Sequence, residues 1–478
     1  MTASTAKRKL FLGTFVHSKA LSELEYLHDS AIAVDETGKI VAVDKDCGDL
    51  AKARETLLPR LGWNEADVEF VQSKDGEFFF PGFIDTHIHA SQYPNAGIFG
   101  SSTLLDWLNT YTFPLESSLA DPVKARRVYA RVIRKTLAHG TTCAAYYATI
   151  NVETTNLLAD LCLTAGQRAL VGRVCMDSAL SPDFYKDASP EAGEEATRKC
   201  IAYIKQVDPN MDLVRPIITP RFAPACSAEL MKRLGKLAEE ENLPIQTHIS
   251  ENKNEIALVK ELFPPAVLAR ATGDESLAKQ HESTYAGVYD AFGLLTSRTI
   301  LAHGVHLTPS ELKLIADRGA TISHCPCSNS SLASGAAPIR RLLLDHGIPV
   351  GLGTDVSGGY SASILEAARE AVLVSRHVCF NAPRDGERDK LSVEEVLWLA
   401  TRGGARVVGL EGKVGAFEEG MEWDAQLVSL GRVVGEEGDG GMEDEVEGER
   451  GNVDVFGWES WPDRIAKRHI CATQPNPT

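Results

Sequence analysis

Short apolar runs alternate with amphipathic segments through the middle of this chain. Each run is short and bounded by polar or glycine-containing stretches, a pattern that predicts a buried β-strand. We expect eight such strands, at residues 79–87, 141–147, 169–176, 214–219, 244–248, 299–303, 320–324 and 349–355. Between most of them the apolar positions recur with helical spacing, as in residues 227–241 and 309–318. The middle of the chain is therefore predicted to consist of repeated strand–helix units.

Eight strand–helix units fit the architecture of a (β/α)8 TIM-type barrel. An open, doubly wound α/β sheet gives the same alternation and is the alternative. In nucleotide-binding sheets of that kind a G-x-G-x-x-G turn follows the first strand, and this motif is missing after residues 79–87. The pattern thus favours an α/β fold with a closed barrel.

The two ends of the chain have a different character, with short strand-like runs and turns. Strands are expected at residues 10–16, 30–35, 40–43, 415–417 and 425–428. We predict that residues 1–78 and 406–478 together form a small β-sandwich domain beside a barrel domain of residues 79–405. Residues 436–450 are acidic and almost without apolar side chains, so we expect a flexible surface loop there. After Trp461 no closing strand is recognisable, which predicts an exposed edge in the small domain.

Composition argues against several classes of partner. The 478 residues include 49 basic and 66 acidic side chains, a balance that disfavours binding to nucleic acid or to an anionic membrane surface. The polar N-terminus lacks the apolar core of a signal peptide, and no apolar run reaches the ~18 residues that span a bilayer. Ten cysteines are scattered without a disulfide framework, so we expect a cytoplasmic protein. Cys325 and Cys327 are interpreted as small buried residues, because the C-x-x-C spacing of zinc sites is absent.

Histidines and one aspartate stand where predicted strands end. His87 and His89 are two residues apart, so on a strand both imidazoles point to the same face. Two polar residues on a solvated strand face are the alternative interpretation. Later strands end in His248, His303 and Asp355, and active sites of barrels lie at these ends. Three imidazoles and a carboxylate can bind a divalent metal ion and leave a position for water.

The other candidate residues indicate how many metal ions the site holds and which histidines lie outside it. Arg221 and Phe222 follow the strand at 214–219, where no lysine is present to bridge a second metal, so we expect a single ion. Surface or local hydrogen-bonding roles are expected for His139, His281, His306 and His346. For His324, at the end of the seventh predicted strand, two roles stay open: lining the pocket rim or capping a loop.

Several blocks of sequence resemble the amidohydrolase superfamily and, within it, the guanine deaminase family. The blocks are PGFIDTHIHASQ (81–92), TPRF (219–222), HISE (248–251), AHG (302–304), HCP (324–326) and GLGTDVSGG (351–359). The resemblance covers roughly residues 10–430. The H-x-H pair and the distal aspartate mark only the superfamily, whereas HASQ, PRF and HISE together are more specific to guanine deaminases.

That resemblance implies one zinc ion per chain, with iron as an alternative, held by His87, His89, His248 and Asp355. It implies deamination of guanine to xanthine and ammonia, a step of purine catabolism, by a homodimer. The implied contacts with guanine come from His89, Gln92, Arg221, Phe222, His248, Glu251 and Asp355. Among the implied catalytic residues, Glu251 is the proton shuttle, Asp355 accepts the proton of water and His303 lies near the reacting centre.

The residue types fit this chemistry independently. A metal ion lowers the pKa of bound water from about 15.7 towards 7. The Arg221 guanidinium only donates hydrogen bonds, so it suits the O6 atom of guanine and disfavours the amino group of adenine. Gln92 can donate and accept along the lactam edge, and Phe222 can stack on the purine.

The zinc deaminase pattern H-x-E with P-C-x-x-C is absent from the sequence. Any deaminase activity must therefore use the barrel route, and we expect a free base as substrate because no basic groove for a polynucleotide is visible.

Two other functions remain possible from the sequence. The first is an amidohydrolase that acts on another aminated ring or on a chlorinated triazine, with the same fold and metal; Gln92, Arg221 and Phe222 decide against it. The second is a non-catalytic scaffold with an amidohydrolase fold. Such a scaffold is disfavoured because the full ligand set and Glu251 are present.

Overall fold

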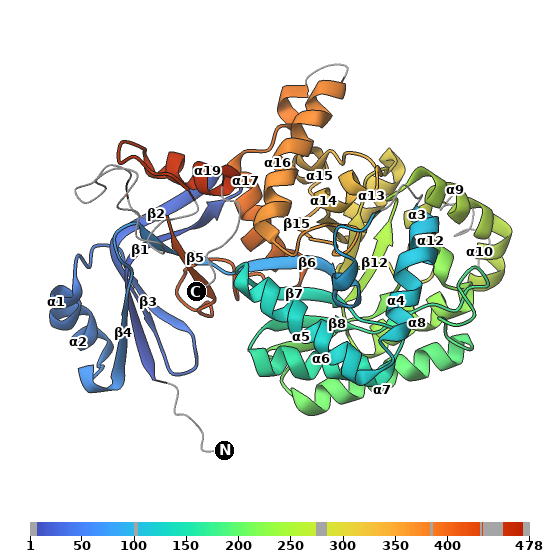
Figure 1. Ribbon diagram of the computed structural model, residues 1–478, viewed down its shortest axis with the longest axis horizontal. Coiled ribbons are helices and arrows are strands. Elements are labelled where there is room, and N and C mark those ends of the chain that lie inside the picture. The colour runs from blue at the N-terminus through green and yellow to red at the C-terminus, as the bar shows by residue number, and fades with distance from the viewer. Residues whose placement is uncertain are drawn as a thin grey trace, which may run out of the picture.

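The computed structural model describes residues 7–99, 104–273, 284–382, 386–430, 433 and 453–471, and shows a mixed α/β architecture with parallel sheets (Figure 1). The parallel strands form two four-stranded sheets, in the orders β10-β8-β7-β6 and β12-β13-β14-β15, and a two-stranded sheet β11-β9. The strands are β6 (Phe83–His89), β7 (Thr141–Tyr147), β8 (Arg168–Gly172), β9 (Val174–Cys175), β10 (Val214–Pro216), β11 (Thr219–Pro220), β12 (Ile245–Ile249), β13 (Thr299–His303), β14 (Thr321–His324) and β15 (Val350–Leu352). Each of the eight predicted runs contains a strand.

The first predicted run needs a correction. Its first residues belong to β5 (Glu77–Pro81), a strand of a separate six-stranded sheet. Strand β6 begins only after Gly82. An added Cβ at Gly82 would collide with the side chains of Thr142 and Asp424. Glycine therefore allows the chain to pass directly from one sheet to the other, and the apolar pattern does not reveal this change.

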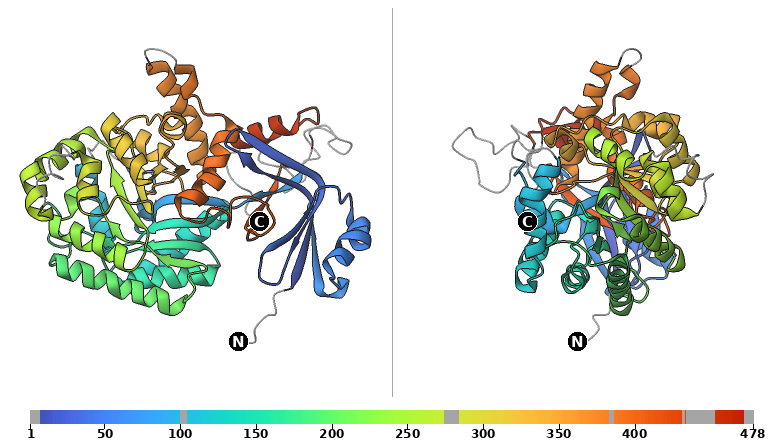
Figure 2. Two further views of the ribbon diagram at one scale, coloured as in Figure 1. Left: turned by 180° about the vertical axis from the view of Figure 1, so that it is seen from behind. Right: turned by 90° about the vertical axis from the view of Figure 1, so that its right-hand side faces the viewer.

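Helices surround the parallel strands, as the views in Figure 2 show. They are α3 (Leu104–Trp107), α4 (Phe113–Ser118), α5 (Pro122–Ala138), α6 (Val152–Ala165), α7 (Pro190–Val207), α8 (Ala228–Glu240), α9 (Lys253–Leu262), α10 (Pro265–Thr272), α12 (Tyr285–Ala291), α13 (Pro309–Arg318), α14 (Pro326–Ser331), α15 (Ile339–Asp345), α16 (Ile364–Asn381), α17 (Val393–Trp398) and α18 (Gly404–Val407). The two helices that the sequence predicts most clearly are α8 and α13. Ser227 caps α8, and Thr308 with Glu311 forms a capping box at α13.

Segments from both ends of the chain build a separate six-stranded sheet. Its order is β16-β5-β1-β2-β3, and β4 also pairs with β1. The strands are β1 (Arg8–Ala20), β2 (Glu23–Val34), β3 (Ile40–Asp44), β4 (Val68–Gln72), β5 and β16 (Ala425–Ser429). Since β16 runs antiparallel to β5, the C-terminal segment completes a sheet that begins near the N-terminus. The two small-domain segments predicted from sequence do meet in space.

Hydrogen bonds join the six described strands of the small sheet, with β4 pairing along residues 8–12 of β1 and β5 pairing at Phe15, and the β-sandwich arrangement stays a prediction. Successive side chains of β1 point to opposite faces. On one face, Leu10 and Leu12 join an apolar cluster with Leu57 and Leu58; the helices of this region are α1 (Leu50–Lys52) and α2 (Leu58–Leu61). On the other face, Phe11 and Phe15 pack in a cluster that includes Phe79 and Phe417.

Three further expectations concern the C-terminal part. Residues 415–417 do not form a strand: Gly415 and Ala416 lie in a bend, and Gly415 has φ 95°. The segment after Trp461 is helix α19 (Trp461–Cys471), and the Trp461 ring packs edge-on against Phe78 with centroids 6.0 Å apart. The acidic run 436–450 lies outside the described residues.

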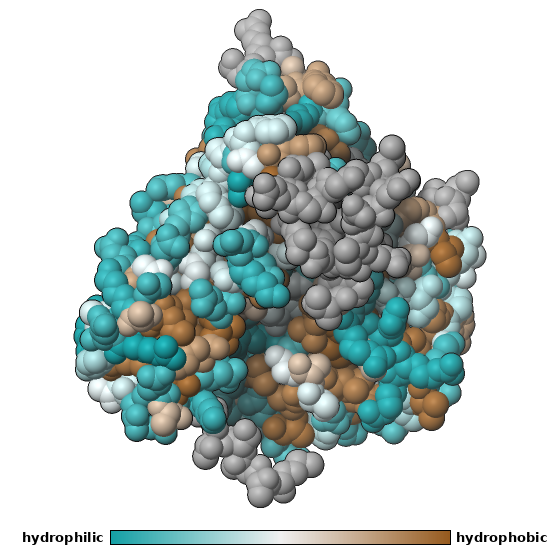
Figure 3. All heavy atoms as spheres, turned by 60° about the vertical axis from the view of Figure 1, so that its left-hand side comes forward, coloured by the Kyte–Doolittle hydropathy of each residue, from teal (hydrophilic) through white to brown (hydrophobic). Residues whose placement is uncertain are grey.

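Two expectations about the whole chain concern its thiols and its surface. Cys325 and Cys327 are free and buried, as predicted. Among the described helices, none combines the length and apolar character needed to cross a membrane. On the face shown in Figure 3, hydrophilic residues separate several apolar areas from one another.

The first and last parallel strands are tied together where they end. Asp85 in β6 accepts hydrogen bonds from the backbone N–H and the hydroxyl of Thr354, at 3.0 and 2.6 Å. The N–H of Asp355 donates to the carbonyl of His87 at 2.8 Å. These bonds fix the end of β15 beside the end of β6, and so bring Asp355 to the two histidines.

Candidate active site

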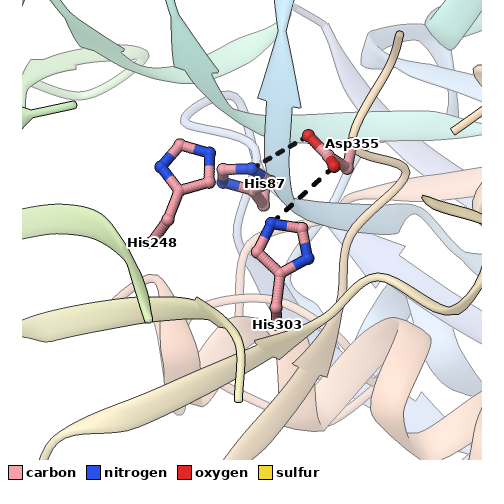
Figure 4. Close-up of side chains that lie close together, drawn as sticks. All are labelled: His87, His248, His303 and Asp355. Atoms are coloured by element: carbon pink, nitrogen blue, oxygen red, sulfur yellow. Dashed lines mark ion pairs between the residues drawn. The ribbon is translucent and has the colours of Figure 1, made fainter. Parts of the chain in front are cut away.

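The predicted metal ligands lie together at the ends of the parallel strands. His87 Nε2 and His89 Nε2 are 3.1 and 3.3 Å from Asp355 Oδ1, and His89 Nε2 is 3.2 Å from His248 Nε2. We name these four residues the His–Asp cluster. His303 from β13 is also close: one ligand atom each from His87, His248, His303 and Asp355 lie within 4.8 Å of one another (Figure 4).

The ring nitrogens of the cluster fit a metal ion. His248 Nδ1 is 2.6 Å from the carbonyl oxygen of Arg221, which only accepts, so Nδ1 carries the proton and Nε2 offers its lone pair. The Nε2 atom of His87 is buried and makes no hydrogen bond in the described structure, although Asp355 Oδ1 lies 3.1 Å away. Burial lowers the pKa of His87, His89 and His248, which favours the neutral imidazoles that bind zinc or iron.

Asp355 supplies the negative charge of the cluster. Burial opposes its ionisation, but the neighbouring His87, His303 and His89 hold the pKa of Asp355 well below its usual range. Asp355 has φ 46°, His303 has φ 75° and Ser250 has φ 48°, all in the left-handed region that favours glycine. Such backbone conformations gather at functional sites when the surrounding structure holds them in place.

His303 and Glu251 form a second polar group beside the cluster. His303 Nδ1 is 2.9 Å from Asn329 Oδ1, and its Nε2 is 3.5 Å from Glu251 Oε2. Ser334 Oγ donates to Glu251 at 2.9 Å. Burial lowers the pKa of His303, but the carboxylates of Glu251 and Asp355 outweigh it and raise the pKa overall. Burial raises the pKa of Glu251. The pair can therefore hold a proton next to the cluster.

Arg221, Phe222 and Gln92 line the same pocket, together with His89, His248 and Asp355 of the cluster. Arg221 is 2% exposed, and its Nη1 lies 2.6 Å from Glu116 Oε2. The Phe222 ring centroid is 6.4 Å from that of His248. The structure thus brings together every residue that the sequence predicts for the site.

The remaining histidines lie as follows. His306 Nε2 is 2.7 Å from the carbonyl oxygen of Ser334, a local hydrogen bond, and His139 and His346 are partly exposed. His281 lies outside the described residues. His324 is fully buried, its pKa is lowered to about 3 by burial, and it is not among the described residues that line the pocket. Of the two roles left open for His324, the structure supports neither.

Four residues of the site escaped the sequence analysis. Asn329 and Ser334 come soon after the HCP block, and Asp85 lies inside the first block, so their places near strand ends could have drawn attention to them. Glu116 is different, because it lies on α4, away from any predicted strand end. The sequence gives one weak signal that Glu116 is a buried charge, namely its position near apolar helical residues such as Phe113.

Comparisons with known proteins agree with this geometry. The model of the family described as "Amidohydrolase family" matches residues 78–457. A probable guanine deaminase from Schizosaccharomyces pombe is 46% identical over 96% of this chain and 79% of that protein. The guanine deaminase of Homo sapiens is 42% identical over 88% of this chain and 86% of that protein.

Solved structures give the same relationship. A guanine deaminase from C. acetobutylicum with guanine bound in its active site superposes with a TM-score of 0.76 and 35% identity, covering 88% of this chain and 90% of that one. A triazine hydrolase reaches a TM-score of 0.72 at only 23% identity, which shows a shared fold alone. The chain belongs to the amidohydrolase family and, within it, to the guanine deaminases.

Proposed function

We propose that this protein hydrolyses guanine to xanthine and ammonia, with one water consumed for each ammonia released. The observation that carries the proposal is that Arg221 and Gln92, which suit the lactam edge of guanine, line the same pocket as the His–Asp cluster. Relatives named guanine deaminase, 42–46% identical over most of the chain, support this substrate.

The residues of the pocket would divide the work as follows. Arg221 would donate hydrogen bonds to O6 of guanine, Gln92 would contact the lactam edge, and Phe222 would cover a face of the purine. Asp355 would accept a proton from the attacking water. Glu251, whose pKa is raised by burial, would donate a proton to the ring nitrogen next to C2 and then help to protonate the departing amine. His303 would orient Glu251.

His87, His89, His248 and Asp355 would hold one divalent ion, for which we propose zinc. When bound, such an ion lowers the pKa of water and stabilises developing negative charge. The neutral ring nitrogens of the cluster and its single carboxylate support this ligand set. We assign His303 outside the set because its nearest carboxylate partner is Glu251, at 3.5 Å, whereas Asp355 is 3.8 Å away.

A comparison of substrates tests the function directly. Purified protein should convert guanine to xanthine and ammonia, and should turn over adenine negligibly, since leaving buried polar groups unpaired can discriminate by ~10⁴. Ultraviolet absorbance of the two bases, with a coupled assay for ammonia, measures both rates. Equal rates on guanine and adenine, or turnover of a chlorinated triazine alone, would show that the base is recognised differently.

We also propose that the parallel sheets close into one (β/α)8 barrel. The backbone bridge between Ile218 and Ile245 supports closure on one side, and the bonds between the ends of β6 and β15 support it on the other. The domain limits 1–78, 79–405 and 406–478, the homodimer and the cytoplasmic location stay predictions. Light scattering of the purified protein would test the homodimer.

A further inference from the structure

We infer that Glu116 is a positioning residue that fixes both side chains proposed to recognise guanine. Glu116 lies on α4 and is fully buried. Its two carboxylate oxygens accept hydrogen bonds from Arg221 at 2.6 and 3.3 Å, and one of them also accepts from Gln92 Nε2 at 2.8 Å. This role rests on the proposed function, because it gives Arg221 and Gln92 their orientation towards the base.

The contact with Glu116 determines which way the Gln92 amide points. A carboxylate only accepts, so the Gln92 atom that faces it must be the NH₂ nitrogen. On its other side, Gln92 Oε1 faces the backbone N–H and the hydroxyl of Ser357, at 3.4 and 3.3 Å. Since the backbone N–H only donates, both neighbours demand the same orientation, and a flipped amide would lose both. One N–H of Gln92 then remains for the substrate.

The same carboxylate fixes the plane of the Arg221 guanidinium. Of the five N–H groups of a guanidinium, one on each terminal nitrogen points to Glu116. The Phe113 ring, one turn before Glu116 on α4, lies 5.0 Å from the central carbon of that guanidinium. Burial lowers the pKa of Arg221, but the Glu116 carboxylate outweighs it and raises the pKa, so Arg221 stays charged in a buried place.

Glu116 acts through these residues rather than on the substrate. Its Oε1 accepts from Ser91 Oγ at 3.4 Å as well as from Gln92 and Arg221. Glu116 is also not among the described residues that line the pocket. Its lone pairs are therefore used within the protein, and its influence on the reaction must pass through Arg221 and Gln92.

Binding of hypoxanthine tests this role without turnover, because hypoxanthine keeps the O6 and N1 edge of guanine but lacks the amine that reacts. In Glu116→Gln the replacing NH₂ group cannot accept from Arg221 or Gln92. We expect the Ki of hypoxanthine to rise about 10- to 100-fold, the scale of a lost hydrogen bond to a charged group. The KM for guanine should rise similarly while kcat changes less and the metal content stays equal to that of wild type.

Two further variants separate positioning from folding. Asp389→Asn breaks another bidentate pair, with Arg341 at 2.6 and 2.6 Å, away from the pocket, and should leave the Ki unchanged. Glu116→Asp keeps the charge but shortens the side chain, so we expect a folded enzyme with a raised Ki. In an Arg221→Ala background, Glu116→Gln should raise the Ki much less than it does in wild type.

The outcomes distinguish this role from the proposed function. If wild type deaminates guanine, but Glu116→Gln and Glu116→Asp bind hypoxanthine as tightly as wild type, the positioning role is wrong and the proposed function stands. If wild type neither deaminates guanine nor binds hypoxanthine, both are overturned together. A raised Ki in both Glu116 variants, with the Asp389→Asn control unchanged, supports the role.

Discussion

Two parts of one pocket treat their buried polar atoms in opposite ways. In the His–Asp cluster, His87 Nε2 lies near Asp355 Oδ1 without making a hydrogen bond in the described structure, and His89 and His248 turn ring nitrogens towards each other. Around Glu116, the polar atoms of Arg221 and Gln92 find partners within the protein. Because an unpaired buried polar group costs about 1–3 kcal/mol, the first arrangement favours an external partner such as an ion, whereas in the second the protein itself orients the side chains and leaves donors such as one Gln92 N–H for the substrate.

Removing a ligand should give the largest effect. His87→Ala is expected to lose the bound ion and nearly all activity, because the remaining cluster no longer surrounds the metal position. Wild type should carry about one divalent ion per chain in elemental analysis, and a chelator should inactivate it reversibly. Two ions per chain, or full activity without any, would contradict a single-ion site.

Glu251→Gln tests proton transfer beside the cluster. The substitution keeps the size of the side chain but removes its acidity, so we expect kcat to fall by roughly 10²- to 10⁴-fold with the metal retained. Glu311→Gln is the matched control, since Glu311 is also buried but serves a helix cap. A metal-replete Glu251→Gln enzyme with normal turnover would exclude the proposed proton shuttle.

Arg221→Ala tests the part of the pocket that is already paired. We expect kcat/KM for guanine to fall about 10²-fold, the scale of lost substrate positioning, while metal content is unchanged. The variant should also unfold at a lower temperature, because Glu116 is left as a buried charge without its partner. Steady-state kinetics and a thermal melt measure the two effects. An unchanged kcat/KM would show that guanine is recognised elsewhere.

Replacing His469 on α19 should have the smallest effect on activity, because this buried histidine lies outside both parts of the pocket. Burial lowers its pKa to about 3 from the ordinary 6.5. Below pH 6.5 the unfolded chain binds a proton that the folded protein does not, so the free energy of unfolding should fall by up to about 1.4 kcal/mol per pH unit towards pH 3.

Replacing this histidine isolates its contribution. His469→Gln should show a weaker loss of stability between pH 6.5 and pH 3, while kcat and metal content at neutral pH stay as in wild type. Urea unfolding at several pH values measures the difference, since all other titrating groups are shared by the two proteins. Identical pH profiles would show that His469 has the same pKa in the folded and the unfolded protein.

The cluster could be predicted from the sequence because its residues share one structural rule. His87, His89, His248, His303 and Asp355 each stand where an apolar run ends, and parallel strands bring those ends to one edge. Only the family resemblance separates His303 from the four expected ligands. The alternation of apolar runs and helical segments likewise predicted all eight strand positions. These features depend on local periodicity, which a single sequence displays directly.

The second part could be predicted only incompletely. Arg221 follows a strand, but its partner Glu116 lies 105 residues earlier on a helix, and such a pairing depends on tertiary packing. For the same reason the sequence did not reveal that residues 79–81 belong to a different sheet from His87, since both runs are apolar. Helix α19 was missed because its mixture of apolar and polar residues is compatible with more than one secondary structure.

The single-residue joint at Gly82 has a consequence for engineering. The N–H of Gly82 donates to the carbonyl of Asp424 at 3.1 Å, and β16 pairs along β5 just before the joint. The small sheet is therefore not a detachable module, because it anchors the base of the strand that carries His87 and His89. An enzyme shortened to the parallel-strand part would lose Phe80 of β5, whose ring centroid lies 5.9 Å from that of Phe83 in β6, and would free that strand at one end. Any minimal version should keep both termini or replace β16 with another covering strand.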